Sequence, residues 1–341
     1  MKCPYCLSEL NYYKVLKTQL NTQNFKCDKC NNEISAIVLH ELKSNPCFTL
    51  GMVGFSNHGK TVYITSLFYM LKIFMNDELW PGLNMLALDQ KSINMVSKRI
   101  DALLQGQLPD ATPENFPEPC LIRFSNLPVA ETVSTYIYDI GGEVYSDLDV
   151  IQEKAELIAK SDTLLFMISI KELERWQEDI YPILNTYIVY AGNKLGIGTH
   201  QLSRRQNLIV VFTKADEIIQ DLPSDIKQSL LEGTYAKYKN IDYALLEKLR
   251  SNSKIIEDWL INKKAAGFVN LARSSFKSVH YTMVSSLGQK PQKDNRLAGS
   301  IQPTDPKNVL DPFVMALGNH VEFPGQPRKS FWKWVRNFLF E

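Results

Sequence analysis

Two pairs of cysteines near the start of the chain have the spacing of a metal site. Cys3 and Cys6 form one CxxC pair, Cys27 and Cys30 form the second, and 20 residues separate the pairs. Thiolates in this arrangement bind Zn²⁺ tetrahedrally, and no secretion signal precedes them that would favour disulfides. We therefore expect a zinc ribbon over residues 1–44, a segment too small to fold without the metal.

Two uses of this ribbon stay open. The first is structural, because metal binding and folding are one event in such a small unit. The second is nucleic-acid binding, although the lysines form no basic block. They are scattered, at Lys2, Lys14, Lys17, Lys26 and Lys29. The remaining cysteines, Cys47 and Cys120, lie in apolar segments and are expected to be small buried side chains.

A second pattern, GFSNHGKT at residues 54–61, follows the short apolar run 48–53 and precedes a segment with helical spacing of apolar residues. In the order strand, loop, helix, the motif GxxxxGK[ST] binds the phosphates of a nucleotide. Glycines let backbone N–H groups approach the phosphates closely, and the helix N-terminus favours negative charge. The predicted nucleotide-binding residues of this loop are Gly54, Asn57, His58, Gly59, Lys60, Thr61 and Val62.

Phosphoryl transfer also needs a metal ion and a carboxylate on a neighbouring strand. We expect Lys60 to bridge the β- and γ-phosphates and to act in catalysis, and the Thr61 hydroxyl to ligate Mg²⁺. Asp139 closes the apolar segment YIYDI and is the predicted second protein ligand of Mg²⁺. Gly142, in the run DIGGE, would offer its N–H to the γ-phosphate, which makes this run a switch.

The base is expected to bind at the end of another strand. VVFTKAD places Thr213, Lys214 and Asp216 at a carboxyl end, where ligands bind in open α/β sheets. The Asp216 carboxylate would pair with two adjacent N–H donors of guanine, an edge that adenine lacks, while the Lys214 stem covers the ring. The other side of the base is assigned to main-chain contacts with Ser285, Ser286 and Leu287.

From residue 46 onward, apolar strand-like and amphipathic helix-like segments alternate, which predicts an α/β fold with a doubly wound, mostly parallel sheet and helices on both faces. We divide the chain into the ribbon 1–44, a main domain 45–320 with helical insertions, and a tail 321–341. Expected strands are 47–53, 120–124, 132–140, 162–170, 207–216 and 280–286, with the second and third antiparallel. Expected helices include 60–75, 92–104 and 311–317, and segment 148–160 is amphipathic.

The motifs GFSNHGKT, DIGG, TKAD and SSLG, in this order, resemble those of the small GTPase superfold over about residues 47–318. The ribbon in front, the GE of DIGGE and the closing element at 306–313 resemble more narrowly the bacterial double-GTPase-like families of the translation-factor-related class. The resemblance implies Mg²⁺-dependent binding of GTP, hydrolysis to GDP and phosphate, and two states that a protein effector or self-association distinguishes.

The chain departs from this pattern at several positions. Many small GTPases have glutamine where Glu143 stands, and a carboxylate beside the γ-phosphate predicts slow hydrolysis. Thr112, in a proline-containing loop, is the candidate switch threonine that closes over Mg²⁺. Asn57 has the position of a potassium-coordinating asparagine, so K⁺ binding and plain loop shaping both stay open. His58 is expected at the loop surface.

Two further segments offer partner surfaces. Residues 234–264 have helical spacing and form either a partner-binding arm or packing on the domain flank. Residues 331–341, FWKWVRNFLFE, concentrate aromatic side chains, so a helix here would either lie on a membrane surface or dock on protein.

The formal net charge of +1 gives no large single-sign field, so it argues neither for nor against a nucleic-acid partner. The longest apolar run, 163–170, is too short to span a bilayer, and we expect a cytoplasmic protein. Three functions compete: an active GTPase switch, a non-catalytic GTP-binding scaffold, and a zinc-dependent nucleic-acid adaptor. An ATP-using enzyme is disfavoured by the TKAD motif.

Overall fold

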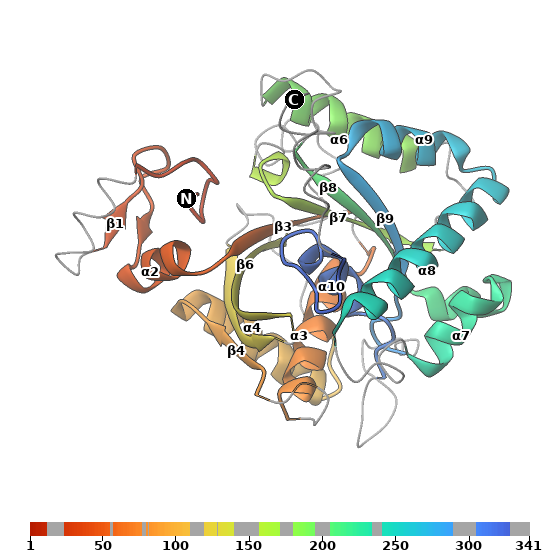
Figure 1. Ribbon diagram of the computed structural model, residues 1–341, viewed down its shortest axis with the longest axis horizontal. Helices are drawn as coiled ribbons and strands as arrows, with labels where there is room; N and C mark the ends of the chain where they lie inside the picture. Colours follow the sequence, from red (N-terminus) through yellow and green to blue (C-terminus); the bar gives the residue numbers. More distant parts are fainter. Residues whose placement is uncertain are drawn as a thin grey trace.

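The computed structural model of the chain describes residues 1–11, 24–54, 57–76, 80, 82–109, 119–127, 129–139, 157–170, 180–194, 205–233, 241–288 and 305–327. Within these residues, a small N-terminal unit lies beside a large sheet that carries helices on both of its faces (Figure 1). This is the α/β architecture, with a mostly parallel sheet, that the alternating sequence pattern predicts.

In its described residues, 1–11 and 24–44, the N-terminal unit contains a two-stranded antiparallel sheet and a helix. Strands β1 (Phe25–Lys26) and β2 (Glu33–Ile34) pair with each other, and helix α2 (Ala36–Ser44) follows. The Ser35 side chain begins this helix by accepting a hydrogen bond from the Val38 N–H at 3.3 Å. The chain then enters the large sheet directly at β3.

The large sheet has seven strands in the order β4-β5-β6-β3-β7-β8-β9. The strands from β6 to β9 run parallel, whereas β4 and β5 pair antiparallel at one edge. Their bounds are β3 (Cys47–Val53), β4 (Asn84–Ala87), β5 (Pro119–Leu127), β6 (Ala130–Asp139), β7 (Thr163–Ser169), β8 (Asn207–Thr213) and β9 (Ser278–Met283). Strand β3 is central, so the loop after it lies between β6 and β7.

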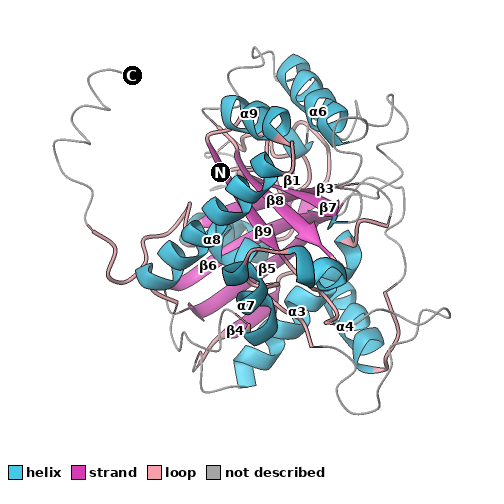
Figure 2. Ribbon diagram, turned by 90° about the vertical axis from the view of Figure 1, so that its right-hand side faces the viewer, coloured by secondary structure: helices cyan, strands magenta, loops and turns pink. Residues whose placement is uncertain are grey.

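Helices cover the sheet from two sides (Figure 2). On one face, α3 (Lys60–Asn76), α4 (Gln90–Leu104) and α10 (Asp311–Leu317) share a core with β3. On the other face, α6 (Tyr181–Lys194) and α9 (Ala266–Ser275) pack over β7 and β8. Helix α8 (Tyr243–Asn262) lies along β9 and contributes to both cores, and η5 (Ala215–Asp221) and α7 (Ser224–Glu232) precede it.

Strand β7 shows why the sheet is buried on both faces. Leu165 and Met167 point into the core with α3, while Leu164, Phe166 and Ile168 point into the core with α6 and α9. A continuous apolar strand of this kind is typical of a parallel sheet covered by helices on both sides. None of the described helices combines the length and apolar composition that a bilayer crossing requires.

The N-terminal unit packs on the side of this sheet. Cys3 and Leu7 share an apolar cluster with Tyr136 and Tyr138 of β6. The Tyr138 hydroxyl donates to the Pro4 carbonyl at 2.6 Å. Two ion pairs add to this contact, Lys2 with Asp162 at 3.2 Å and Glu41 with Arg123 at 2.8 Å. The predicted ribbon is therefore a separate unit in sequence that shares part of its core with the sheet.

Most of the expected elements that fall within the described residues are confirmed. The antiparallel pair β5 and β6, the strands β3, β7, β8 and β9, and the helices α3, α4 and α10 all lie where the sequence predicts them, to within a few residues. The edge strand β4 and helix α6 were not expected. Most of segment 148–160, the beginning of segment 234–264 and the whole of 331–341 lie outside the described residues.

Candidate functional site

The four ribbon cysteines form a tight cluster. Their sulfur atoms all lie within 4.8 Å of one another, with Cys3 and Cys30 3.8 Å apart and Cys6 and Cys27 3.9 Å apart. A tetrahedral zinc ion with Zn–S bonds of about 2.3 Å requires sulfur atoms about 3.8 Å apart. The cluster can therefore hold a zinc ion after small shifts of the cysteine side chains.

Thiol acidity differs within this cluster. Burial raises the pKa of Cys3 well above its usual value. At Cys27, burial acts in the same direction, but the backbone N–H groups of Cys30 and Lys29 stabilise the thiolate, and the pKa is lowered to about 7. A bound cation would favour the thiolate form at all four positions, because zinc binds deprotonated cysteine.

The loop after β3 turns sharply before α3 begins. Gly54 has no room for a side chain, because a Cβ there would lie 2.4 Å from the Met167 carbonyl oxygen. Asn57 and Gly59 both adopt left-handed backbone conformations, with φ of 65° and 77°. Close approach and positive φ are the two properties for which a phosphate-binding loop needs glycine.

Lys60 begins α3 and turns back over this loop. Its ammonium group donates to the Gly54 carbonyl at 2.5 Å, and the side chain is buried. Burial lowers the pKa of Lys60 to about 8, while the negative charge of Asp139 acts in the opposite direction. A buried cation at the start of a helix gives this loop the charge that an anion requires.

Asp139 ends β6 and lies beside the same loop, because β6 and β3 are parallel neighbours and Asp139 pairs in register with Met52. The Asp139 carboxylate also accepts a hydrogen bond at 2.9 Å from the Nη2 atom of Arg99, which belongs to α4. Arg99 is a site residue that the sequence analysis missed. An arginine on the polar side of an amphipathic helix carries no motif that marks it.

The end of β8 contacts the loop directly. The Thr213 hydroxyl donates to the His58 carbonyl at 2.9 Å, and the Lys214 ammonium donates to the Asn57 carbonyl at 2.9 Å. Lys214 itself has a left-handed φ of 58°, which turns the chain into η5. These two bonds fix the loop after β3 to the strand that carries the predicted base-binding residues.

Asp216 is positioned by the segment after β9. The Ser285 hydroxyl donates to the Asp216 carboxylate at 2.6 Å and accepts from the Gly288 N–H at 3.0 Å. The Ser286 carbonyl accepts from the Ser66 hydroxyl of α3 at 2.6 Å. Leu287 packs in a small apolar cluster with Leu103 and Val62. The predicted base-binding residues are thus connected to the predicted phosphate loop through α3.

The prediction that His58 lies at the loop surface is wrong. The sequence analysis placed it at the loop surface, but its side chain is buried and its Nδ1 lies 3.2 Å from the Met167 carbonyl. The reason is the position of β7, which runs beside β3 and covers the loop from a distant part of the sequence. Thr61, by contrast, is half-buried at the first turn of α3.

Three predicted residues lie outside the described part of the chain: Thr112, Gly142 and Glu143. Their predicted roles in the switch and in hydrolysis stay predictions. Of the other two cysteines, Cys120 is buried and Cys47 is half-buried, in keeping with the expectation of small packed side chains.

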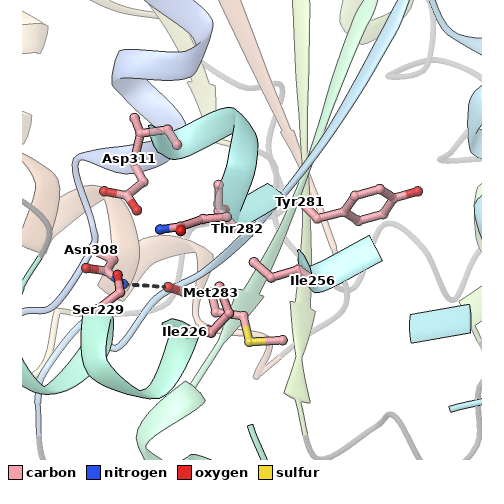
Figure 3. Close-up of a pocket in the computed structure, with 10 residues that line it drawn as sticks. Ile226, Ser229, Ile256, Tyr281, Thr282, Met283, Asn308 and Asp311 are labelled. Carbon is pink, nitrogen blue, oxygen red and sulfur yellow. Dashed lines mark hydrogen bonds between the residues drawn. The ribbon is translucent and has the colours of Figure 1, made fainter. Parts of the chain in front are cut away.

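A cavity between α7, α8, β9 and the segment before α10 is distinct from this edge of the sheet (Figure 3). Asn308 donates to the Ser229 hydroxyl at 2.9 Å there and lies near the Met283 carbonyl, whereas the Tyr281 ring points away from both. The cavity volume is about 10 Å³. That is room for about one water molecule and for no larger ligand.

Comparison with known proteins adds no assignment, since neither the models of protein families nor the curated proteins include a match to this chain. What the chain does must therefore be argued from its own residues.

Proposed function

We propose that the chain is a Mg²⁺-dependent GTP-binding protein that hydrolyses GTP slowly to GDP and phosphate and acts as a nucleotide-controlled switch. One observation carries the proposal: the loop after β3, the end of β6 at Asp139, the TKAD segment and Ser285 lie at one carboxyl edge of a parallel sheet, and hydrogen bonds join the loop to TKAD and TKAD to Ser285. In open α/β sheets this edge is where ligands bind.

Phosphate binding is assigned to the loop between β3 and α3, in the manner of a P-loop. Gly54 and Gly59 allow the backbone to approach an anion, and the buried Lys60 ammonium supplies a positive charge for the β- and γ-phosphates. Thr61 and Asp139 would hold Mg²⁺, which neutralises developing charge on the transferred phosphate. The donor set fits, because a hydroxyl and a carboxylate are hard oxygen ligands.

Guanine selectivity is assigned to Asp216. Its carboxylate is oriented by the Ser285 hydroxyl, and it follows Lys214, which is itself bonded to the loop. Two acceptor oxygens match the two adjacent N–H donors of guanine, whereas adenine presents no such pair. We also propose that the chain is a member of the small GTPase superfold. Within that superfold, its relation is to the double-GTPase-like families.

The test is a titration of the intact chain with fluorescently labelled GDP, GTP and ATP in the presence of Mg²⁺, repeated with Lys60→Ala. We expect both guanine nucleotides to bind and ATP to bind at least about 100-fold more weakly, because adenine would leave the half-buried Asp216 carboxylate without the two charge-assisted hydrogen bonds that guanine offers. Lys60→Ala should abolish the binding. Equal affinity for ATP and GTP, or unchanged binding by the variant, would refute the assignment.

Hydrolysis is separated from binding by measuring phosphate release under single-turnover conditions. The carboxylate of Glu143 predicts a rate well below about 1 per second for the isolated chain. Release at the uncatalysed background rate would favour the non-catalytic scaffold, which needs GTP binding alone. Equal rates in potassium and sodium salts would exclude a role for K⁺ at Asn57.

A further inference from the structure

We propose that Arg99 is an internal cationic residue of the triphosphate site: it pairs with Asp139 when Mg²⁺ is absent and turns to the phosphate oxygens when Mg²⁺ and GTP bind. This inference rests on the proposed function and adds to it a residue and an exchange of partners.

The Arg99–Asp139 pair is buried at the site itself. Nη2 of Arg99 lies 2.9 Å from Oδ2 of Asp139, and the two side chains are only 13% and 4% exposed. Burial lowers the pKa of the neighbouring Lys60, and the Asp139 carboxylate is close enough to act in the opposite direction. Two cationic side chains, Arg99 and Lys60, therefore lie near the Asp139 carboxylate.

The Arg99 guanidinium is incompletely satisfied in this arrangement. Its Nη1 is buried and has no hydrogen-bond partner among the residues that the structure describes. A buried donor without a partner is unfavourable, and a guanidinium fork matches the oxygens of a phosphate. The observation points to an anionic ligand that supplies the second set of acceptors.

Helix α4 is held in place, so that any movement of Arg99 is a movement of its side chain. The Asp89 carboxylate caps the helix by accepting from the Ser92 N–H at 2.7 Å. The Ser92 hydroxyl accepts from the Leu121 N–H of β5 at 2.9 Å. Near its other end, Leu103 packs with Val62 and Leu287.

A Mg²⁺ ion on Asp139 would weaken the Arg99–Asp139 pair, because it withdraws negative charge from the carboxylate that holds Arg99. A Mg²⁺ ion on the Asp139 carboxylate would stand within a few ångströms of the guanidinium, and like charges at that distance repel strongly in a buried site. The carboxylate then holds Arg99 less strongly, and the buried guanidinium gains from a second counter-charge. The nearest anion that the proposed function provides is the triphosphate.

The experiment uses the intact chain and Arg99→Gln, titrated with labelled GDP and with a non-hydrolysable GTP analogue over a series of Mg²⁺ concentrations. We expect the affinity ratio of analogue to GDP to fall about tenfold or more, the effect of losing a charged hydrogen bond to phosphate. The Mg²⁺ concentration for half-maximal GDP binding should fall several-fold, because the competitor for Asp139 is gone.

Arg123→Gln is the matched control, since this arginine pairs with Glu41 of the N-terminal unit. Arg123→Gln should change neither the affinity ratio of analogue to GDP nor the Mg²⁺ concentration for half-maximal GDP binding. If this control shows the same changes as Arg99→Gln, the inference is overturned. Arg99→Lys covers the case in which Arg99→Gln does not fold: it keeps a cation near Asp139, so the Mg²⁺ dependence should stay while the analogue-to-GDP ratio falls.

The experiment distinguishes a failure of the proposed function from a failure of the role of Arg99. A wild-type chain that binds no guanine nucleotide refutes the proposed function. A wild-type chain that binds both nucleotides, with Arg99→Gln and Arg99→Lys matching it within twofold in both quantities, refutes the role of Arg99 alone.

Discussion

The two candidate sites of this chain are assembled in opposite ways. The cysteine cluster takes all four ligands from two short turns within the first 30 residues, and its sulfur atoms already have zinc-compatible spacing. The edge that contains Lys60, Asp139 and Asp216 takes its residues from the end of β6 and from the segments that follow β3 and β8, which are tens of residues apart in the sequence. One site is a property of local spacing, and the other is a property of sheet topology.

This difference has an energetic consequence. The N-terminal unit is small and we expect it to need zinc for folding, whereas the edge with Lys60 and Asp139 belongs to a sheet that is buried on both faces and has its own large cores. Removing a ligand should therefore unfold the first site and leave the second folded. The predictions below test that contrast, beginning with the largest effect.

Removal of zinc is expected to have the largest effect, roughly 10 kcal/mol of local stability. With a chelator, or with Cys27→Ser, amide hydrogen exchange should become fast in β1, β2 and α2, while β7 and β8 keep their protection. Cys47→Ser, which removes a thiol outside the cluster, should retain the metal. Metal-free protein with unchanged protection across 24–44 would contradict a zinc-dependent fold.

Lys60 should destabilise the nucleotide-free fold, because burial lowers its pKa from 10.5 to about 8. Between these two values the unfolded chain binds more protons, so wild-type stability rises with pH in that range. Lys60→Met should therefore be more stable than wild type at pH 7, by up to about 3 kcal/mol, and the gap should narrow by about pH 9.5.

Urea denaturation without nucleotide measures this gap. Lys72→Met, an exposed position on the same helix, serves as the control and should show little difference at either pH. A stability gap that does not change with pH would show that the Lys60 charge is not the cause.

Ser285→Ala should have the smallest effect. The variant loses the hydrogen bond that orients the Asp216 carboxylate, and we expect GDP to bind about three- to tenfold more weakly. ATP binding should not change, so the ratio of GDP affinity to ATP affinity becomes smaller. Ser274→Ala removes a comparable hydroxyl from the exposed surface of α9. If Ser285→Ala and Ser274→Ala have the same affinity for GDP, Ser285 does not position the base-binding carboxylate.

The fold was largely predictable because its strands and helices have strong local patterns. Buried parallel strands such as β3, β7 and β8 are continuous apolar runs, and α3 is a long, largely apolar segment that directly follows the loop motif. The short edge strand β4 is only half-buried and has no such signal. Helix α6 was not predicted, because its apolar composition alone did not mark it as a helix. It follows a segment that lies outside the described residues.

The site was predictable where a motif required particular residue types, and not where tertiary contact decides. Gly54 and Lys60 follow from backbone and charge requirements of a phosphate loop. The burial of His58 depends on β7, whose Met167 lies 109 positions away, and the Arg99–Asp139 pair depends on how α4 packs against α3 and β5. No local pattern encodes either contact.

The central claim is that a guanine nucleotide is recognised at the edge of the sheet where these distant strands meet. Its most direct test is Asp216→Asn, titrated with GTP and with xanthosine triphosphate against the wild-type chain. We predict that the variant loses about 100-fold in affinity for GTP and gains affinity for the xanthine nucleotide, whose edge matches an amide. Unchanged GTP affinity in this variant, with no gain for the xanthine nucleotide, would contradict the account.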